Sequence, residues 1–244
     1  MLKILKNLKQ SWLSVLTIVA LLCVQAAVDL ELPNYTSKIV NTGIQAGGIE
    51  YAVPETISSK DMEAILLFSN DDDKILENYT TEESDGNYVI KDLKENEKEE
   101  LEQIMTKPII ISRTVQKEEM ANKIKEQILI NVPEEQKEML QNMSIIDILK
   151  TMPEEQINQM LSESTKQIDE MQDSIKSQAA VAYVKEIYKD AGVDTDKIQM
   201  NYIMVAGFKM LILAAISMAS GITIIMLSSR VGAKMAKTLR EKIF

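Results

Sequence analysis

The chain has 244 residues, of which 45% are hydrophobic, 26% charged and 5% aromatic, a composition typical of a folded protein. The net charge of −10 is unevenly distributed, since residues 33–199 carry 18 Lys and Arg against 34 Asp and Glu while both ends are basic. The acidic middle excludes nucleic acid as a partner, and the lack of His with a single Cys excludes His-based catalysis, Cys/His zinc sites and an intrachain disulfide.

Residues 1–10 place leucines at every third position beside Lys3, Lys6 and Lys9. This pattern predicts a short interfacial helix with its leucines in the acyl boundary and its lysines at the head groups. A plain basic flank explains the same residues equally well.

Residues 12–28 form the first apolar run, and at about 1.5 Å per residue they reach roughly 25 Å, close to the thickness of a bilayer core. We expect a first membrane span within residues 11–45. The alternative is a cleaved signal peptide, but no clear small-residue cleavage site follows the run. Leu22 just before Cys23 also disfavours a lipoprotein.

Polar residues interrupt the second half of this predicted span. Gln25, Asp29 and Glu31 are candidates for a substrate pathway, because an ionisable side chain at membrane depth is costly and therefore usually functional. The alternative places Asp29 and Glu31 at the outer water interface. Pro33 is expected to kink the helix, since it lacks the backbone N–H of an interior helical residue.

Residues 46–195 are polar and predict a mostly helical domain between two spans. We expect a helix from Ser58 or Ser59 to Phe68, a short strand at residues 88–90 and a helix over residues 95–105. The acidic run at residues 71–73 lacks the spacing of a calcium-binding loop. No catalytic pair of side chains stands out in this domain.

The second half of this domain predicts further helices. Pro133 and Pro153 each precede Glu-Glu-Gln and indicate helix starts, because Pro and acidic residues favour the first turn. We expect one long helix over residues 153–189, stopped by Gly192, and then a new helix capped by Asp194 or Thr195.

Residues 210–229 form the second apolar run, 20 residues without a charge, and predict a second span within residues 196–229. Ser217 and Gly221 lie four residues apart and provide a candidate small-residue face for close helix packing. The alternative is that small residues are simply common in spans. Residues 230–244 are basic and are expected to begin a helical extension into the cytoplasm.

The basic residues next to the two runs set the orientation. The predicted cytoplasmic anchors are Lys3, Lys6, Lys9, Arg230, Lys234 and Arg240. Both termini are therefore expected in the cytoplasm and residues 46–195 outside the cell. The predicted fold class is mainly α, with two transmembrane helices and a mostly helical extracellular domain inserted between them.

Two segments carry a family resemblance. Residues 1–44 combine a basic amphipathic start, an apolar run, the sequence Asp-Leu-Glu-Leu-Pro at 29–33 and Ser-Lys-Ile-Val-Asn-Thr-Gly-Ile at 37–44. Residues 228–244 end in a basic tail with Leu-Arg-Glu-Lys-Ile-Phe. Together these segments resemble the start of the transmembrane domain of bacterial ABC exporters of the multidrug and lipid-flippase type.

The resemblance implies a multi-pass protein of the bacterial cell membrane that contacts lipid, the remaining spans, an ATPase domain and a second transporter half, identical or different. ATP and Mg²⁺ would serve the parent protein. This chain contains neither a Gly-rich phosphate loop nor a dinucleotide-binding motif, so it is expected to bind no cofactor or metal and to be no enzyme by itself. Family members usually have a short loop where this chain has its polar domain, and they continue beyond the second span. The chain is therefore expected to be a fragment, a truncated reading frame or a split subunit.

The predicted function is a membrane-spanning part of an ATP-driven exporter that contributes to the substrate pathway and transmits motion from the ATPase domain. One alternative is a stand-alone two-pass membrane protein whose extracellular domain binds a peptide or a partner protein. A secreted protein with a cleaved signal is a further alternative, and it requires that residues 203–229 do not span the membrane.

Overall fold

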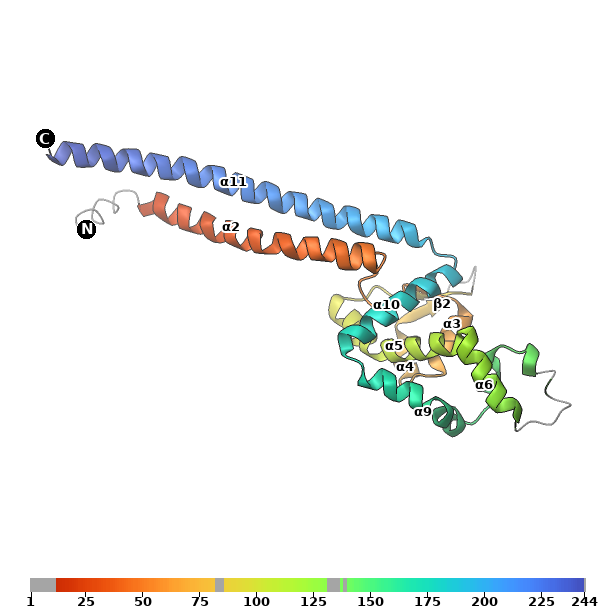
Figure 1. The fold of residues 1–244 in the computed structure, drawn as a ribbon. Helices are drawn as coiled ribbons and strands as arrows, with labels where there is room; N and C mark the ends of the chain where they lie inside the picture. Colours follow the sequence, from red (N-terminus) through yellow and green to blue (C-terminus); the bar gives the residue numbers. More distant parts are fainter. Residues whose placement is uncertain (1–11, 82–85, 131–136, 138–139, 244) are drawn as a thin grey trace. The chain divides into compact units, whose positions relative to one another are not determined.

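A computed structural model describes residues 12–81, 86–130, 137 and 140–243, and its fold is mainly α (Figure 1). The predicted interfacial helix of residues 1–10 lies outside the described residues. The chain forms two compact units. One comprises residues 1–48 and 200–244, and the other comprises residues 49–199.

The first unit contains the two predicted spans, and both helices are long and apolar enough to cross a membrane. Helix α2 spans Trp12–Lys38 and is followed by a π-helix, η2, at Ile39–Gln45. Helix α11 spans Thr195–Ile243. Although α2 contains Pro33, its α-helical geometry continues to Lys38, and the change to the wider π-turn begins only six residues after the proline.

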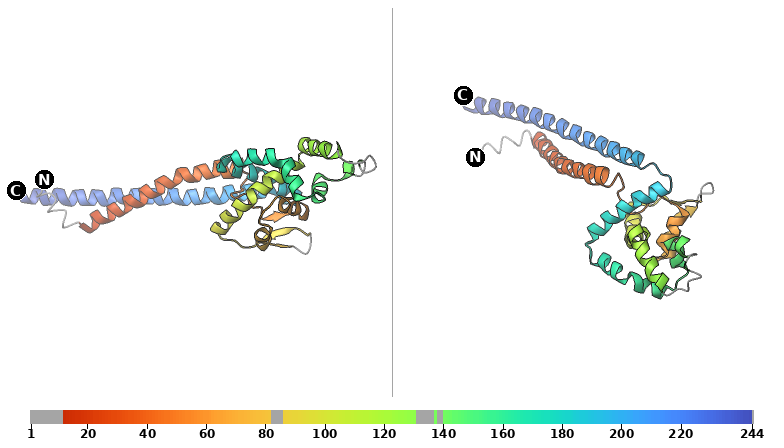
Figure 2. Two further views of the ribbon diagram at one scale, coloured as in Figure 1. Left: turned by 90° about the horizontal axis from the view of Figure 1, so that it is seen from below. Right: turned by 45° about the vertical axis from the view of Figure 1, so that its right-hand side comes forward.

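Helices α2 and α11 lie side by side in opposite directions (Figures 1 and 2). Their contacts follow one register. Asp29 faces Ser217, Thr36 faces Met210, and Gly43 faces Ile203, so that each pair of residue numbers adds to 246. These pairs are seven residues apart, which is the repeat of two helices packed along a continuous seam.

The tightest part of this seam is at Gly43. A Cβ atom at Gly43 would lie 2.9 Å from Ile203 Cγ1 and 3.5 Å from Tyr202 Cδ1. Glycine at this position therefore lets the backbone of η2 approach α11 closely.

We expect Gly43→Ala to weaken the contact between the helices by about 1–3 kcal/mol, the usual cost of overpacking. The measurement is the rate of disulfide formation between Thr36→Cys and Met210→Cys in a Cys23→Ala background, which should fall. Gly207→Ala is the matched control, because no atom lies within 4 Å of a Cβ there. Close packing at Gly43 would be refuted if Gly43→Ala and Gly207→Ala had the same effect on the cross-linking rate. If close packing is correct, Ile203→Ala should restore the rate in the Gly43→Ala protein.

The second unit is built around one long helix, α5. The helices of this unit are α3 (Ser59–Leu66), α4 (Asp72–Glu77), α5 (Glu95–Gln116), α6 (Glu118–Ile130), α8 (Ile145–Lys150), α9 (Glu154–Glu170) and α10 (Asp173–Asp190). A small antiparallel sheet has the order β1 (Thr56–Ile57), β3 (Tyr88–Ile90) and β2 (Tyr79–Thr81).

Burial on α5 follows the helical period. Leu101, Met105 and Ile109 of α5 are almost completely buried, as are Val184 and Ile187 of α10. Burying such side chains contributes about 1.5–3 kcal/mol each, which makes the α5–α10 contact a major source of stability for this unit.

Several predicted boundaries are confirmed. Ser58 caps α3 by accepting a hydrogen bond from the Asp61 N–H, and Gly192 ends α10 with a φ of 74°. Asp194 caps α11 by accepting bonds from the N–H groups of Asp196 and Lys197. The strand β3 lies where it was predicted, while β1 and β2 were not predicted.

The prediction of one long helix over residues 153–189 is wrong. The chain breaks into α9 and α10 at Met171 and Gln172, both of which adopt extended backbone angles. The break redirects the chain so that Val184 and Ile187 of α10 are buried. The helix start predicted at Pro133 lies outside the described residues.

Candidate functional site

The structure brings together two groups of residues that the sequence singled out separately. Ser217 Oγ of α11 donates a hydrogen bond of 2.7 Å to Asp29 Oδ1 of α2. One turn further along, a Cβ atom at Gly221 would lie 3.8 Å from Gln25 Nε2. The candidate pathway residues Asp29 and Gln25 therefore face the candidate packing residues across the helix pair.

The register also sets the depth of Asp29. Lys209 and Arg230 bound the uncharged run of α11, and their separation corresponds to about 31 Å of helix, the thickness of a bilayer core. Ser217 lies about 12 Å along the helix from Lys209. Because Asp29 is bonded to Ser217, its carboxylate lies at the level of the uncharged run of α11.

The backbone around Asp29 is also unusual. Pro33 has no N–H and leaves the Asp29 carbonyl without its ordinary helical donor. Glu31 is exposed, and its Oε2 accepts a long hydrogen bond of 3.5 Å from Asn34 Nδ2. Both residues are exposed, but the Asp29 carboxylate is bonded to α11 whereas the hydrogen bond of the Glu31 carboxylate stays within α2.

We expect Ser217→Ala to weaken the pairing of α2 and α11 by about 0.6 kcal/mol and at most about 1.7 kcal/mol, the range for hydrogen bonds between membrane helices. Thr223→Val is the matched control, because the Thr223 hydroxyl donates to Ala219 O of its own helix. The cross-linking rate between residues 36 and 210 should fall for the first variant and not for the second. Equal cross-linking rates for the parent, Ser217→Ala and Thr223→Val proteins would show that the hydrogen bond between Ser217 and Asp29 contributes nothing to the pairing of the helices.

The predicted anchors lie in two places. Lys3, Lys6 and Lys9 fall outside the described residues. Arg230, Lys234 and Arg240 all lie on the last part of α11, which continues as one helix past the end of the uncharged run. The basic residues after the second run are therefore carried by a helical extension.

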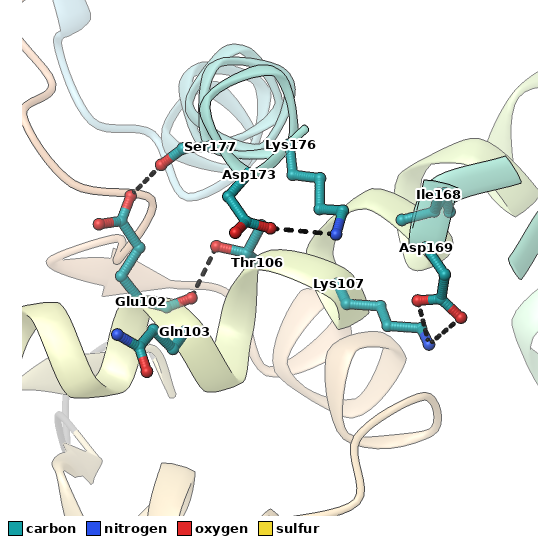
Figure 3. Close-up of a pocket in the computed structure, with 9 residues that line it drawn as sticks. All are labelled: Glu102, Gln103, Thr106, Lys107, Ile168, Asp169, Asp173, Lys176 and Ser177. Atoms are coloured by element: carbon teal, nitrogen blue, oxygen red, sulfur yellow. Dashed lines mark hydrogen bonds and ion pairs between the residues drawn. The ribbon is translucent and has the colours of Figure 1, made fainter. Parts of the chain in front are cut away.

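The second unit contains a polar pocket between α5, α9 and α10, with a volume of about 610 Å³ (Figure 3). Lys107 forms an ion pair of 2.7 Å with Asp169, and Lys176 forms one of 3.2 Å with Asp173. Glu102 reaches the rim of the pocket, where its Oε1 accepts a 2.5 Å hydrogen bond from Ser177. The pocket thus carries charges of both signs, which suits a polar or zwitterionic ligand.

A charge cluster with two buried members, Arg113 and Asp61, joins three helices of the same unit. Arg113 of α5 pairs with Asp61 of α3 at 3.1 Å and with Asp190 of α10 at 2.8 Å. Burial raises the pKa of Asp61, while the Arg113 guanidinium and the Ser58 hydroxyl oppose that rise. This cluster was not predicted from the sequence, although a single Arg between the buried residues Ile109, Ile110 and Ile111 on one side and Val115 on the other was a usable signal.

Within the described part of the chain, no group of three or more acidic or Cys side chains is arranged to hold a metal ion. Comparison of the chain with protein-family models, curated proteins and solved structures gives no significant match.

Proposed function

We propose that this chain forms the first two spans and the external domain of one transmembrane half of an ATP-driven exporter. In this role it contributes to the substrate pathway and transmits motion from an ATPase domain that belongs to the parent protein. The remaining spans, a second half, identical or different, and membrane lipid are its proposed partners. ATP and Mg²⁺ would bind to the ATPase domain.

Helix α11 is the observation that carries this proposal. Its 49 residues correspond to about 73 Å, more than twice the thickness of a bilayer core. The helix continues past residue 229 into a segment that includes Arg230, Lys234 and Arg240. A helix that leaves the membrane without a break and carries basic residues is suited to transmit movement between a cytoplasmic domain and the spans.

The polar residues of α2 support a role in the substrate pathway. Asp29 and Glu31 place carboxylates near the level of the uncharged run, where they would attract a cationic substrate. Gln25 adds a neutral hydrogen-bonding group one turn away.

Topology provides the first test of this proposal. We expect an impermeant maleimide to label Glu119→Cys in intact bacteria and to label Lys234→Cys only after permeabilisation, both in a Cys23→Ala background. The Glu119 side chain is 86% exposed, so a cysteine at this position should react whenever the reagent can reach the side of the membrane on which it lies. Labelling of Lys234→Cys in intact cells would contradict the proposed orientation, with both termini in the cytoplasm and residues 46–195 outside.

Genomic DNA downstream of codon 244 provides the second test. Further spans followed by a phosphate-binding loop and an ATPase signature would support the exporter. A stop codon without such sequences nearby would favour the second candidate below.

The pocket favours a second candidate function, a two-pass membrane protein whose external domain binds a peptide or partner protein. Its paired lysines and carboxylates can exchange their partners for the charged groups of a peptide. In this case Lys107→Ala should abolish binding without affecting any transport activity.

A further inference from the structure

The second unit is connected to the spans at its two ends, and these ends are bonded to each other. The entry segment, residues 49–57, follows α2 and η2, while α10 leads into α11. The Glu55 N–H of the entry segment donates a hydrogen bond of 2.8 Å to Tyr188 Oη of α10. Tyr188 is 3% exposed whereas Glu55 is an exposed residue, so this contact is partly buried.

A second link joins the same two segments through α5. Glu102 Oε1 accepts a hydrogen bond of 3.0 Å from the Ala52 N–H of the entry segment. The same oxygen accepts the bond from Ser177 of α10. Ser177 and Tyr188 are about three helical turns apart on α10, so the two links fix the orientation of the entry segment as well as its distance from α10.

A third contact fastens the end of α10. Asp190 is the last residue of this helix and pairs with Arg113, which also pairs with the buried Asp61. The turn at Gly192 and the Asp194 cap then lead directly into α11. The end of α10 is thereby bonded to α3 and α5 just before the chain turns into the second span.

We propose that residues 49–199 form a bracket, which holds the two points where the spans leave it at a fixed separation. The inference goes beyond the proposed transport function and is independent of it, because it uses only bonds within residues 49–199 and the continuity of the chain. Burial raises the pKa of Tyr188 to about 12, so its hydroxyl stays neutral throughout the physiological pH range.

The test measures the distance between nitroxide labels at Val40→Cys on α2–η2 and Val205→Cys on α11, in the full chain, with Cys23→Ala, in lipid nanodiscs. Both positions are exposed. We expect a narrow distance distribution by pulsed electron paramagnetic resonance. Tyr188→Phe combined with Glu102→Ala removes both links and should broaden the distribution at least about twofold, since local restraints set the range of motion.

The matched control is Tyr79→Phe combined with Lys107→Ala. The Tyr79 hydroxyl donates to Pro54 O at 2.7 Å, which ties the entry segment to β2 and not to α10. The control also loses one buried hydrogen bond and one side chain of α5, and we expect its distance distribution to match that of the parent protein. Equal broadening in both variants, or no broadening in a folded Tyr188→Phe/Glu102→Ala protein, would overturn the bracket.

Hydrogen exchange of the unmodified protein keeps the inference testable if the variants unfold. We expect the Ala52 and Glu55 amides to exchange as slowly as the buried Val184 and Ile187 amides of α10, because one opening event must expose them all. Exchange of Ala52 and Glu55 at least about a hundredfold faster than that of α10 would refute the bracket.

Discussion

Replacement of Arg113 by Met should destabilise the second unit by about 3–5 kcal/mol at neutral pH, because it leaves a buried carboxylate without its cation. The Asp61 side chain is 7% exposed, and Arg113 is the main group that counteracts the effect of burial on its pKa. The measurement is urea unfolding of the detergent-solubilised chain, followed by circular dichroism. The loss should be several times larger than for Lys107→Met, since Lys107 of the same helix forms an exposed pair worth at most about 1 kcal/mol.

This loss should depend on pH in a defined direction. Burial raises the pKa of Asp61 above its ordinary value of 3.8, and removal of Arg113 should raise it further. A carboxyl group whose pKa is higher in the folded state than in the unfolded state stabilises the folded protein when the pH is below its unfolded-state pKa. This stabilisation is lost as the pH rises through its folded-state pKa. The Arg113→Met protein should therefore approach the stability of the parent protein near pH 4 and fall behind it towards neutrality.

A second substitution distinguishes a charge effect from a packing effect. Asp61→Asn removes the unpaired charge from the Arg113→Met protein and should restore part of its stability at neutral pH. If the double variant were as unstable as Arg113→Met alone at every pH, lost packing rather than the buried charge would explain the result.

Neutralisation of Glu31 should lower transport of monovalent organic cations by about tenfold in the full-length exporter that we propose, which corresponds to a loss of about 1.4 kcal/mol. Glu31 is exposed on α2 and lies two residues from Asp29, whose carboxylate is bonded to α11. The measurement is ATP-dependent uptake into inverted membrane vesicles by the parent and Glu31→Gln proteins. Uptake of neutral substrates should not change, because an uncharged substrate gains no charge attraction from the Glu31 carboxylate.

Glu77→Gln is the matched control, since it makes the same chemical change at the end of α4, in the unit of residues 49–199. It should leave transport unchanged. Unchanged uptake of every cation tested in the Glu31→Gln protein would remove Glu31 from the substrate pathway.

Local interactions made several features predictable from the sequence. The Ser58 cap, the Gly192 stop and the Asp194 cap each depend on bonds between residues at most five positions apart, so the sequence nearby contains the whole signal. The two apolar runs were predictable for a similar reason, because length and absence of charge alone identify them.

Contacts between distant residues explain what could not be predicted. Asp29 and Ser217 were each recognised as notable, but their bond joins positions 188 residues apart and requires the register of two helices. The break at Met171 and Gln172 contains neither Gly nor Pro and depends on packing of α10. Arg113 reads as a surface charge until its two carboxylates from α3 and α10 are known.

The contrast between α11 and the α2–η2 segment has a mechanical consequence. A regular helix of 49 residues resists torsion, so a rotation applied at Thr195 arrives at Lys237 about the same axis. In α2–η2, Pro33 removes one hydrogen bond and the π-turn at Ile39–Gln45 widens the helix, so part of an applied twist is absorbed there. The pair thus combines one torsionally stiff member with one compliant member, and a twist passing from one end of the pair to the other would travel mainly along the stiff one.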